Sequence, residues 1–235
     1  MITVRSILFV ALFYAWSTAL ALAMIPLLLT PRRWMIAAMR TWAQGIIALL
    51  RLTCQIRVEF RGLRHLDQGA ALIGAKHQCM FDTMGPLAVF TDACYVMKKE
   101  LTSIPFFGWY CLKAGMISID RAGQAATLRK LLADGRAKVS EGRQLVIFPE
   151  GTRTPPGETG VYQPGVAGLY RALNTPCVPL ATNSGAHWPA HGFLRRPGII
   201  VYEFLEPIPS GLPREVFMET LQSRIEAASA ALLEL

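Results

Sequence analysis

The expected fold is decided by the stretch from Gln124 to Arg153, which reads QAATLRKLLADGRAKVSEGRQLVIFPEGTR. Its first part, Gln124–Ser140, has a helical pattern that is closed by Gly142, a residue that commonly ends helices. Its second part is the short apolar run Leu145–Phe148, which leads into a charged turn. A continuous apolar run of this length after a helix is typical of a strand that is covered on both faces of a sheet.

The same alternation extends along the chain on both sides of this stretch. Further apolar runs predict strands over Ala70–Ala75, Cys94–Met97, Met116–Ile119, Val178–Ala181 and Ile199–Phe204. Further helices are predicted over Gly85–Asp92, Gly165–Leu173 and Pro213–Leu233. Strands that alternate with helices indicate an α/β layered fold, with a central, largely parallel or mixed sheet flanked by helices.

Composition narrows the class of protein. The chain has 235 residues, enough for one sizeable core, and 52% of them are apolar while 17% are charged. This balance is more apolar than that of a typical soluble enzyme and points to a membrane. The net charge of +8 suits nucleic acid, an anionic bilayer or a phosphorylated substrate. Nucleic acid fits poorly, because no basic run is interleaved with aromatic residues.

The amino terminus carries a membrane signal. Ile7–Leu29 holds no charge and is long enough to cross a hydrocarbon core of about 30 Å. One arginine, Arg5, precedes it, and three follow: Arg32, Arg33 and Arg40. The downstream excess of positive charge predicts that the rest of the chain faces the cytoplasm, at the inner membrane. The competing interpretation is a cleaved signal peptide, because small residues recur over Ala19–Ala23.

The next stretch, Trp34–Leu52, is apolar but interrupted by Arg40, Gln44 and Arg51. It is either a helix that lies along the membrane interface or an ordinary helix that faces the core. We therefore expect residues 1–55 to form a hydrophobic two-helix membrane segment and residues 56–235 to form the catalytic domain.

The five cysteines are odd in number and include no C-x-x-C pair. This argues against a disulfide framework and against a zinc site, and for a reducing compartment. No metal site and no bound cofactor are expected.

Charged residues follow four of the predicted strands. The segments are Lys76-His77 with Asp82 five positions after the histidine, Lys98-Lys99, Asp120-Arg121 and Pro149-Glu150-Gly151-Thr152-Arg153. In open α/β sheets the carboxyl ends of parallel strands share one rim, and ligands bind there. We therefore expect one imidazole, carboxylates and several cations to meet at one rim.

A neutral imidazole suits proton removal near neutral pH, and a carboxylate that fixes its tautomer improves it as a base. A strand-end turn that curls back would let Asp82 reach His77. The ordinary alternative is a solvated histidine, with Asp82 capping the next helix.

Phe148–Arg153 ends a strand in a tight turn. Gly151 permits a positive φ and free backbone amides, Arg153 can grip a phosphate, and Glu150 can support that arginine or bond a substrate hydroxyl. An ordinary surface turn is the alternative, as exposed cations are for Arg121 and for Lys98 or Lys99.

Taken together, these blocks resemble the bacterial 1-acylglycerol-3-phosphate acyltransferases of the glycerolipid acyltransferase superfamily. The resemblance runs from about Leu72 to Gly185. Four blocks occur in the family's order: Lys76–Asp82 with the H-x-x-x-x-D spacing, Gly115–Arg121, Phe148–Arg153 and Val178–Leu180. Cys79 and Phe81 stand where relatives often carry Ser and Trp.

The resemblance implies an O-acyltransferase that acylates the sn-2 hydroxyl of lysophosphatidic acid to give phosphatidic acid, with acyl-CoA or acyl carrier protein as donor. It implies that His77 is the general base and that Asp82 orients it. It places the acceptor phosphate and its pocket at Lys98, Arg121, Glu150, Gly151, Thr152 and Arg153. The alternatives are an acyltransferase for another lysolipid such as lyso-ornithine lipid, a non-catalytic membrane lipid-binding protein, and a membrane phosphohydrolase.

Overall fold

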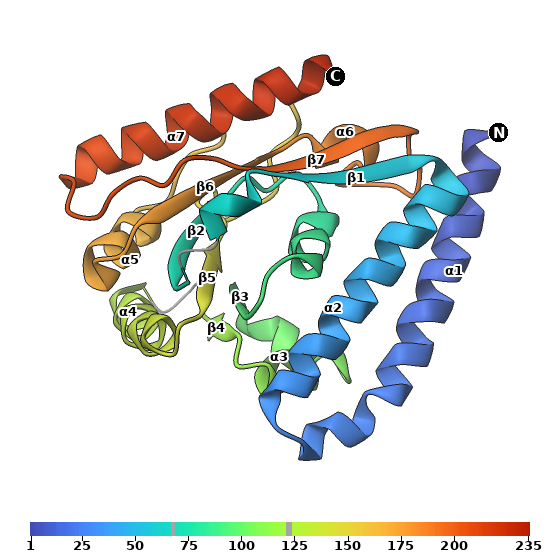
Figure 1. The fold of residues 1–235 in the computed structure, drawn as a ribbon, viewed down its shortest axis with the longest axis horizontal. Helices are drawn as coiled ribbons and strands as arrows, with labels where there is room; N and C mark the ends of the chain where they lie inside the picture. The colour runs from blue at the N-terminus through green and yellow to red at the C-terminus, as the bar shows by residue number, and fades with distance from the viewer. Residues whose placement is uncertain (67–68, 121–123) are drawn as a thin grey trace.

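The structure, a computed structural model, describes residues 1–66, 69–120 and 124–235 of the chain. Within these residues a seven-stranded sheet forms the centre, in the order β1-β7-β6-β2-β5-β3-β4 (Figure 1). The strands are β1 (Ile56–Arg61), β2 (Ala71–Ala75), β3 (Ala93–Lys98), β4 (Ile117–Ile119), β5 (Gln144–Ile147), β6 (Cys177–Thr182) and β7 (Gly198–Phe204).

Most neighbouring strands run parallel. β4, β3, β5, β2 and β6 form one parallel block, β7 pairs antiparallel with β6, and β1 pairs parallel with β7. The expected α/β fold with a largely parallel or mixed sheet is therefore confirmed. Every residue of β2, β5 and β6 is buried, as their continuous apolar sequences predict for strands covered on both faces.

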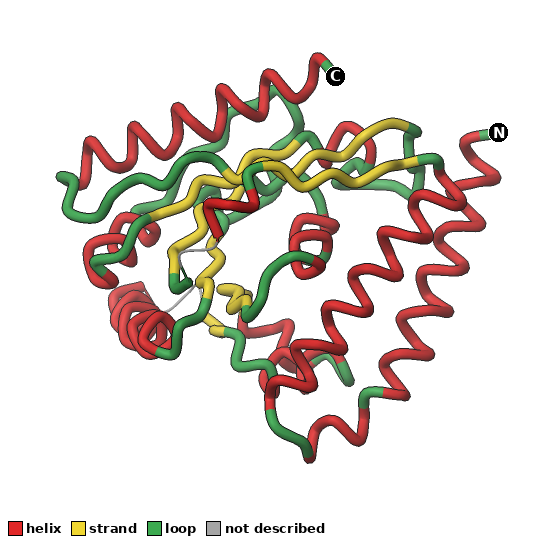
Figure 2. The backbone as a smooth tube through the Cα atoms, in the orientation of Figure 1, coloured by secondary structure: helices red, strands yellow, loops and turns green. Residues whose placement is uncertain are grey.

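Helices cover both faces of the sheet (Figures 1 and 2). One face carries α1 (Ile2–Ala23), α2 (Arg32–Leu49) and α3 (Phe107–Lys113), and the other carries α4 (Gln124–Ser140), α5 (Gly165–Leu173) and α7 (Arg214–Ala231). The one-turn helix α6 (Ser184–His187) follows β6. Short 3-10 or π turns complete the chain: η1 (Ile25–Leu29), η2 (Leu50–Cys54), η3 (Leu63–Leu66), η4 (Met80–Thr83), η5 (Gly85–Ala88), η6 (Lys99–Ser103) and η8 (Leu232–Glu234).

The two faces have separate cores, because successive side chains of a strand point to opposite sides. Ile73 and Val146 pack with Met35 and Ile46 of α2 in one core. The adjacent Leu72 belongs to the other core, which includes Leu169 of α5 and Phe217 and Leu221 of α7.

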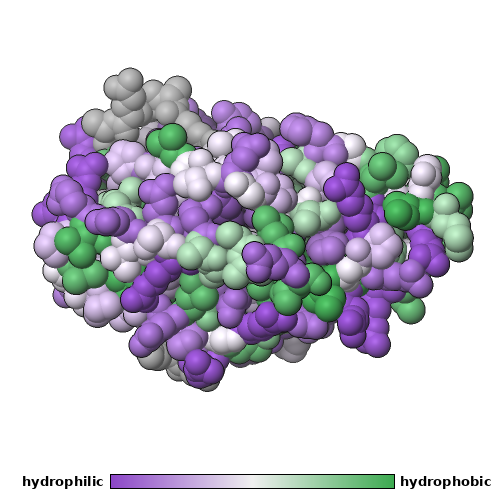
Figure 3. All heavy atoms as spheres, turned by 90° about the horizontal axis from the view of Figure 1, so that it is seen from above, coloured by the Kyte–Doolittle hydropathy of each residue, from purple (hydrophilic) through white to green (hydrophobic). Residues whose placement is uncertain are grey.

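The first helix, α1, is long and apolar enough to cross a membrane, and only 11% of its most apolar 18-residue window is buried. It ends at Ala23 rather than continuing to Leu29, because Pro26 lacks a backbone N–H and η1 takes over. Viewed from the α7 side, the molecule is mostly hydrophilic, and apolar residues gather at the end where α1 lies (Figure 3).

The second helix, α2, faces the core. Met35, Met39, Ala43 and Ile46 are buried at helical spacing in the core that this helix shares with the sheet. Arg32 forms an ion pair with Asp92 (2.6 Å), and the Arg40 guanidinium donates to the carbonyl oxygen of Phe90. Of the two expected membrane helices, only α1 therefore has the composition of a span. Arg32 and Arg40, two of the three arginines from which the membrane orientation was predicted, hold α2 against the segment that precedes β3.

The predicted helix over Gly85–Asp92 is wrong. The segment forms the short turn η5, with hydrogen bonds of the i to i−3 kind such as that from Leu87 N–H to Met84 O (3.1 Å). Pro86 removes one helix donor, and the chain must turn quickly from η4 into β3.

Candidate active site

The parallel block brings the predicted site residues to one rim of the sheet. Because these strands are parallel, β2, β3, β4, β5 and β6 all end at the same edge of the sheet. His77 follows β2, Lys98 ends β3, Asp120 follows β4 and Glu150 follows β5. The expected meeting of these segments at the carboxyl ends of the strands is confirmed.

The His77 imidazole contacts the Asp82 carboxylate, with Nδ1 3.1 Å from Oδ2. The local structure explains how residues five positions apart make this contact. Asp82 lies in the first turn of η4, where its carboxylate accepts the backbone N–H groups of Gln78 (2.6 Å) and Cys79 (2.8 Å). This cap folds the carboxylate back onto the ring. The predicted contact with His77 is therefore present, and Asp82 caps the turn η4 in which it lies rather than a following helix.

Two hydroxyl groups from distant elements also hold Asp82, which is 3% exposed. Ser184 Oγ of α6 donates to Oδ1 at 2.5 Å, and Tyr202 Oη of β7 donates to the same oxygen at 3.1 Å. Burial and the nearby Asp82 charge raise the pKa of Tyr202, so its hydroxyl remains a donor. Neither Ser184 nor Tyr202 is among the predicted site residues, and Tyr202 reaches Asp82 through the antiparallel pairing of β7 with β6.

His77 itself is held on three sides. Its ring stacks on Phe148 at 4.2 Å between centroids, its backbone N–H donates to Glu150 Oε2 (3.1 Å), and its carbonyl accepts the Thr154 N–H (2.8 Å). The side chain is 14% exposed. In the described part of the chain no group hydrogen-bonds to Nε2, which leaves that nitrogen available to a substrate.

Glu150 lies behind His77 rather than facing a substrate. Its side chain is fully buried, Oε1 accepts from Lys76 Nζ (2.7 Å), and Oε2 accepts from the His77 backbone. Both oxygens are therefore engaged inside the protein. Lys76 is also buried and was not among the predicted site residues, because its second partner is Glu226, 150 positions away in the sequence.

The turn after β5 has the predicted backbone conformation, but its amide group makes a different contact from the predicted one. Gly151 adopts a φ of +67°, as expected for this position. Its N–H closes the turn onto the carbonyl of Phe148 (3.0 Å) instead of facing an anion. Thr152 and Arg153 are exposed, and the Arg153 guanidinium donates to the carbonyl of Ala190 (3.1 Å).

The other predicted phosphate ligands lie at the ends of β3 and β4. Lys98 is exposed at the end of β3. The adjacent Lys99 lies 3.9 Å from Asp120. Arg121 lies outside the described residues.

An apolar cleft of about 580 Å³ opens beside the turn at Gly151 and Thr152. Its walls come from the ends of β3, β4 and β5 and from α4 and α5. The apolar lining includes Val96, Leu128, Leu131, Ile147 and Val166. Phe148 is among the residues that line this cleft, and its ring stacks on His77.

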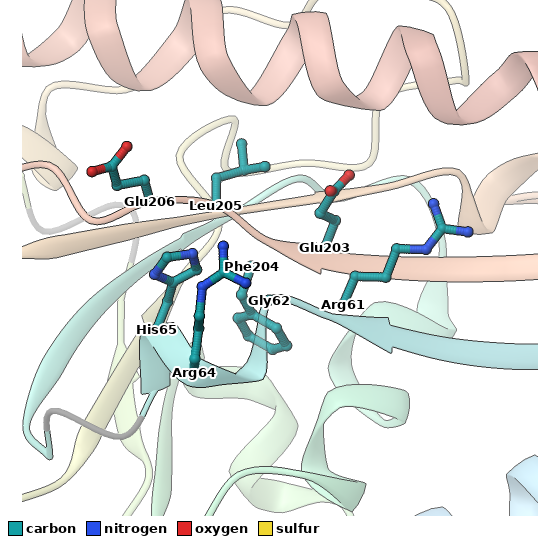
Figure 4. Close-up of a pocket in the computed structure, with 8 residues that line it drawn as sticks. All are labelled: Arg61, Gly62, Arg64, His65, Glu203, Phe204, Leu205 and Glu206. Atoms are coloured by element: carbon teal, nitrogen blue, oxygen red, sulfur yellow. The ribbon is translucent and has the colours of Figure 1, made fainter.

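A larger hollow of about 700 Å³ lies elsewhere (Figure 4). Arg61, Arg64 and His65 line it together with Glu203 and Glu206. β1 and β7 run opposite to β6, so this hollow lies at the other end of the sheet from His77. It contains no predicted site residue, and its charges are of both signs.

The chain is similar to known proteins in sequence and in fold. The Acyltransferase family profile matches residues 57–183. The chain is 33% identical to a 1-acyl-sn-glycerol-3-phosphate acyltransferase of Pseudomonas aeruginosa, over 84% of this chain and 77% of that protein. It is 39% identical to the Helicobacter pylori protein of the same name, over 43% of each. The crystal structure of the 1-acyl-sn-glycerophosphate acyltransferase from Thermotoga maritima shares the fold, with a TM-score of 0.82 over 99% of this chain and 98% of that one, at 18% identity.

Proposed function

The chain belongs to the 1-acyl-sn-glycerol-3-phosphate acyltransferase family, and we propose that it transfers a fatty acyl group from an acyl thioester to the sn-2 hydroxyl of lysophosphatidic acid. The product is phosphatidic acid, which feeds phospholipid synthesis. The observation that carries the proposal is the contact between His77 and Asp82 at the sheet rim, with the second ring nitrogen left for substrate.

In the proposed reaction, Nε2 of His77 removes the proton from the acceptor hydroxyl while Nδ1–H remains bonded to Asp82. The resulting oxygen nucleophile attacks the thioester carbonyl, the C–O bond forms and the C–S bond breaks. The departing thiolate then takes the proton from the imidazolium. No enzyme-bound acyl group is required, and acyl-CoA or acyl carrier protein supplies the thioester.

The acceptor phosphate is assigned to the cations of the rim. Arg153 supports this role because it is exposed on the turn after β5, and Lys98 because it is exposed at the end of β3. The family pattern adds Arg121. A guanidinium can bind phosphate through two parallel hydrogen bonds, which an ammonium group cannot do.

The test uses purified protein in mixed vesicles with labelled acyl-CoA and lysophosphatidic acid. We expect phosphatidic acid from the wild type, and a rate lower by about 10²-fold or more for His77→Ala, the scale of a lost general base. Asp82→Asn should also be impaired, because the amide no longer fixes the tautomer. Arg153→Ala should mainly raise KM for the acceptor.

Three results would reject the proposal. Acylation of lyso-ornithine lipid but not of lysophosphatidic acid would assign a different acceptor. Lipid binding that His77→Ala retains, without turnover in the wild type, would indicate a lipid-binding protein. Phosphate release without a thioester would indicate a phosphohydrolase.

We also propose that the enzyme works at the cytoplasmic face of the inner membrane. The positive charge that follows α1 in the sequence supports this orientation. The apolar surface of α1 supports the membrane contact, and α3 extends that surface: Phe107, Trp109 and Leu112 are 42%, 47% and 54% exposed. α3 lies at the foot of the helix pair, where the Tyr110 hydroxyl donates to the carbonyl of Ala21 (Figure 1). Half-exposed aromatic rings on a short helix suit the headgroup level of a bilayer.

A further inference from the structure

A buried cluster of charges lies directly behind the turn from His77 to Asp82. The Lys76 side chain is 1% exposed, and its Nζ lies 2.7 Å from Glu150 Oε1 and 2.9 Å and 2.8 Å from the two carboxylate oxygens of Glu226. The carbonyl of Glu158 accepts a further hydrogen bond from Nζ at 3.0 Å. An ammonium group is buried this deeply only when opposite charges and acceptors surround it.

This cluster is connected to the backbone of His77. Glu150 uses its second oxygen to accept the His77 N–H, so a continuous series of contacts runs from His77 through Glu150 and Lys76 to Glu226. Lys76 and His77 are also adjacent in the chain. A shift of the ammonium group therefore acts on the histidine by two routes, through Glu150 and through the peptide bond.

Glu226 belongs to α7, which lies beyond the family match at residues 57–183. Phe217, Leu221 and Ile225 of α7 are fully buried against α5 and the sheet, so the helix is firmly placed. Tyr162 Oη donates to Glu226 Oε1 at 2.9 Å and fixes the carboxylate from the other side.

We propose that Glu226 is a positioning residue for acyl transfer. It holds Lys76, and Lys76 with Glu150 sets the backbone of His77, so that the imidazole stays on Asp82 while Nε2 faces the acceptor hydroxyl. This role presupposes the proposed function of His77. Because small misplacements of a reacting group are costly in rate, a contact two residues removed from the imidazole can control turnover.

The test compares Glu226→Gln with Glu219→Gln, a change at an exposed position of the same helix. Glu226→Gln keeps the shape and removes the charge that faces Lys76. We expect kcat to fall about tenfold with KM for lysophosphatidic acid unchanged, since the substrate-binding cations are untouched. Glu219→Gln should match the wild type. An unchanged kcat for Glu226→Gln would overturn the proposal.

A purely structural effect is separated by repeating the change in the His77→Ala background. If Glu226 acts by placing the imidazole, Glu226→Gln should cost nothing further once the imidazole is gone. A second tenfold loss in that background would indicate loss of folded enzyme and would overturn the proposal. If His77→Ala itself were fully active, the proposed function would fail instead, so the two failures are distinguishable.

Tyr162→Phe is a milder variant in case Glu226→Gln does not fold. It removes only the hydroxyl that fixes the carboxylate. We expect kcat to fall about threefold, again with KM unchanged and with no added effect in the His77→Ala background. Wild-type kcat in Tyr162→Phe, together with an unfolded Glu226→Gln protein, would reject the positioning role in favour of a stabilising one.

Discussion

At the scale of single residues, the position of Cys79 raises the question of whether its thiol acts as a nucleophile. It sits between His77 and Asp82 in sequence, and its Sγ lies 3.4 Å from Ser184 Oγ. Yet burial and the Asp82 charge raise the pKa of this thiol well above its ordinary value. The thiolate is the reactive form of cysteine, so a thiol kept protonated is a poor nucleophile.

We therefore expect Cys79→Ala to retain the wild-type kcat within about threefold, whereas His77→Ala loses about 10²-fold. N-ethylmaleimide at pH 7.5 should leave the folded enzyme active, because all five free cysteines are buried. Residual activity after alkylation is the measurement, with heat-unfolded protein as the positive control for labelling. Inactivation that acyl-CoA prevents would argue for a cysteine in the reaction.

The contact between His77 and Asp82 could be predicted because both residues lie in one short segment. The contacts made by residues distant in sequence were not predicted. His77 and Asp82 are only five positions apart, and the turn η4 brings their side chains into contact. Tyr202 and Glu226 come from β7 and α7, where no pattern marks them, and only the folded chain brings them to the turn. Glu150 was predicted to face the substrate or Arg153, but its carboxylate instead binds the buried Lys76 and the backbone of His77.

At the scale of elements, continuous apolar runs were the reliable signal. The six predicted strands lie within about two residues of β2 to β7, because burial on both faces leaves little room for polar residues. β1 was not predicted, since Ile56–Arg61 mixes charged and apolar residues as a partly exposed edge strand does. α3 was also missed, because a seven-residue helix has too few turns for its periodicity to stand out.

The proposed membrane contact of α3 can be tested separately from that of α1. Because the native cysteines are buried, Trp109→Cys offers one reactive thiol for an environment-sensitive fluorophore. In vesicles of anionic lipid we expect a blue-shifted emission that brominated lipids quench, because a half-exposed apolar position beside η1 would enter the interface. The matched control is Val216→Cys on α7, which is 46% exposed and should stay in water. Equal emission from both labels would refute membrane contact by α3.

At the scale of the whole molecule, the turn from His77 to Asp82 is held by elements from nearly the whole chain. Met35 and Ile46 of α2 share a core with the strands that end at the rim, so α2 is packed as part of this fold. β7 and α7 lie beyond the matched family region, and they supply Tyr202 and Glu226. The two residues of the proposed proton transfer are thus close in sequence, whereas the residues that hold them in place come from distant elements of the fold.

Buried thiols are expected to lower the stability of the folded protein at alkaline pH. Burial raises the pKa of Cys94 to about 11 and that of Cys111 to about 12, from an ordinary value of 9.0. Between pH 9 and 11 the unfolded chain releases protons that the folded protein retains, so stability is lost as the pH rises, on the order of 2 kcal/mol per thiol. We expect the melting temperature to be level from about pH 7 to 8.5 and to fall above about pH 9. The fall should be shallower in the Cys94→Ala/Cys111→Ala variant, whatever its melting temperature at neutral pH. Parallel curves for variant and wild type would show that these thiols do not set the alkaline limit.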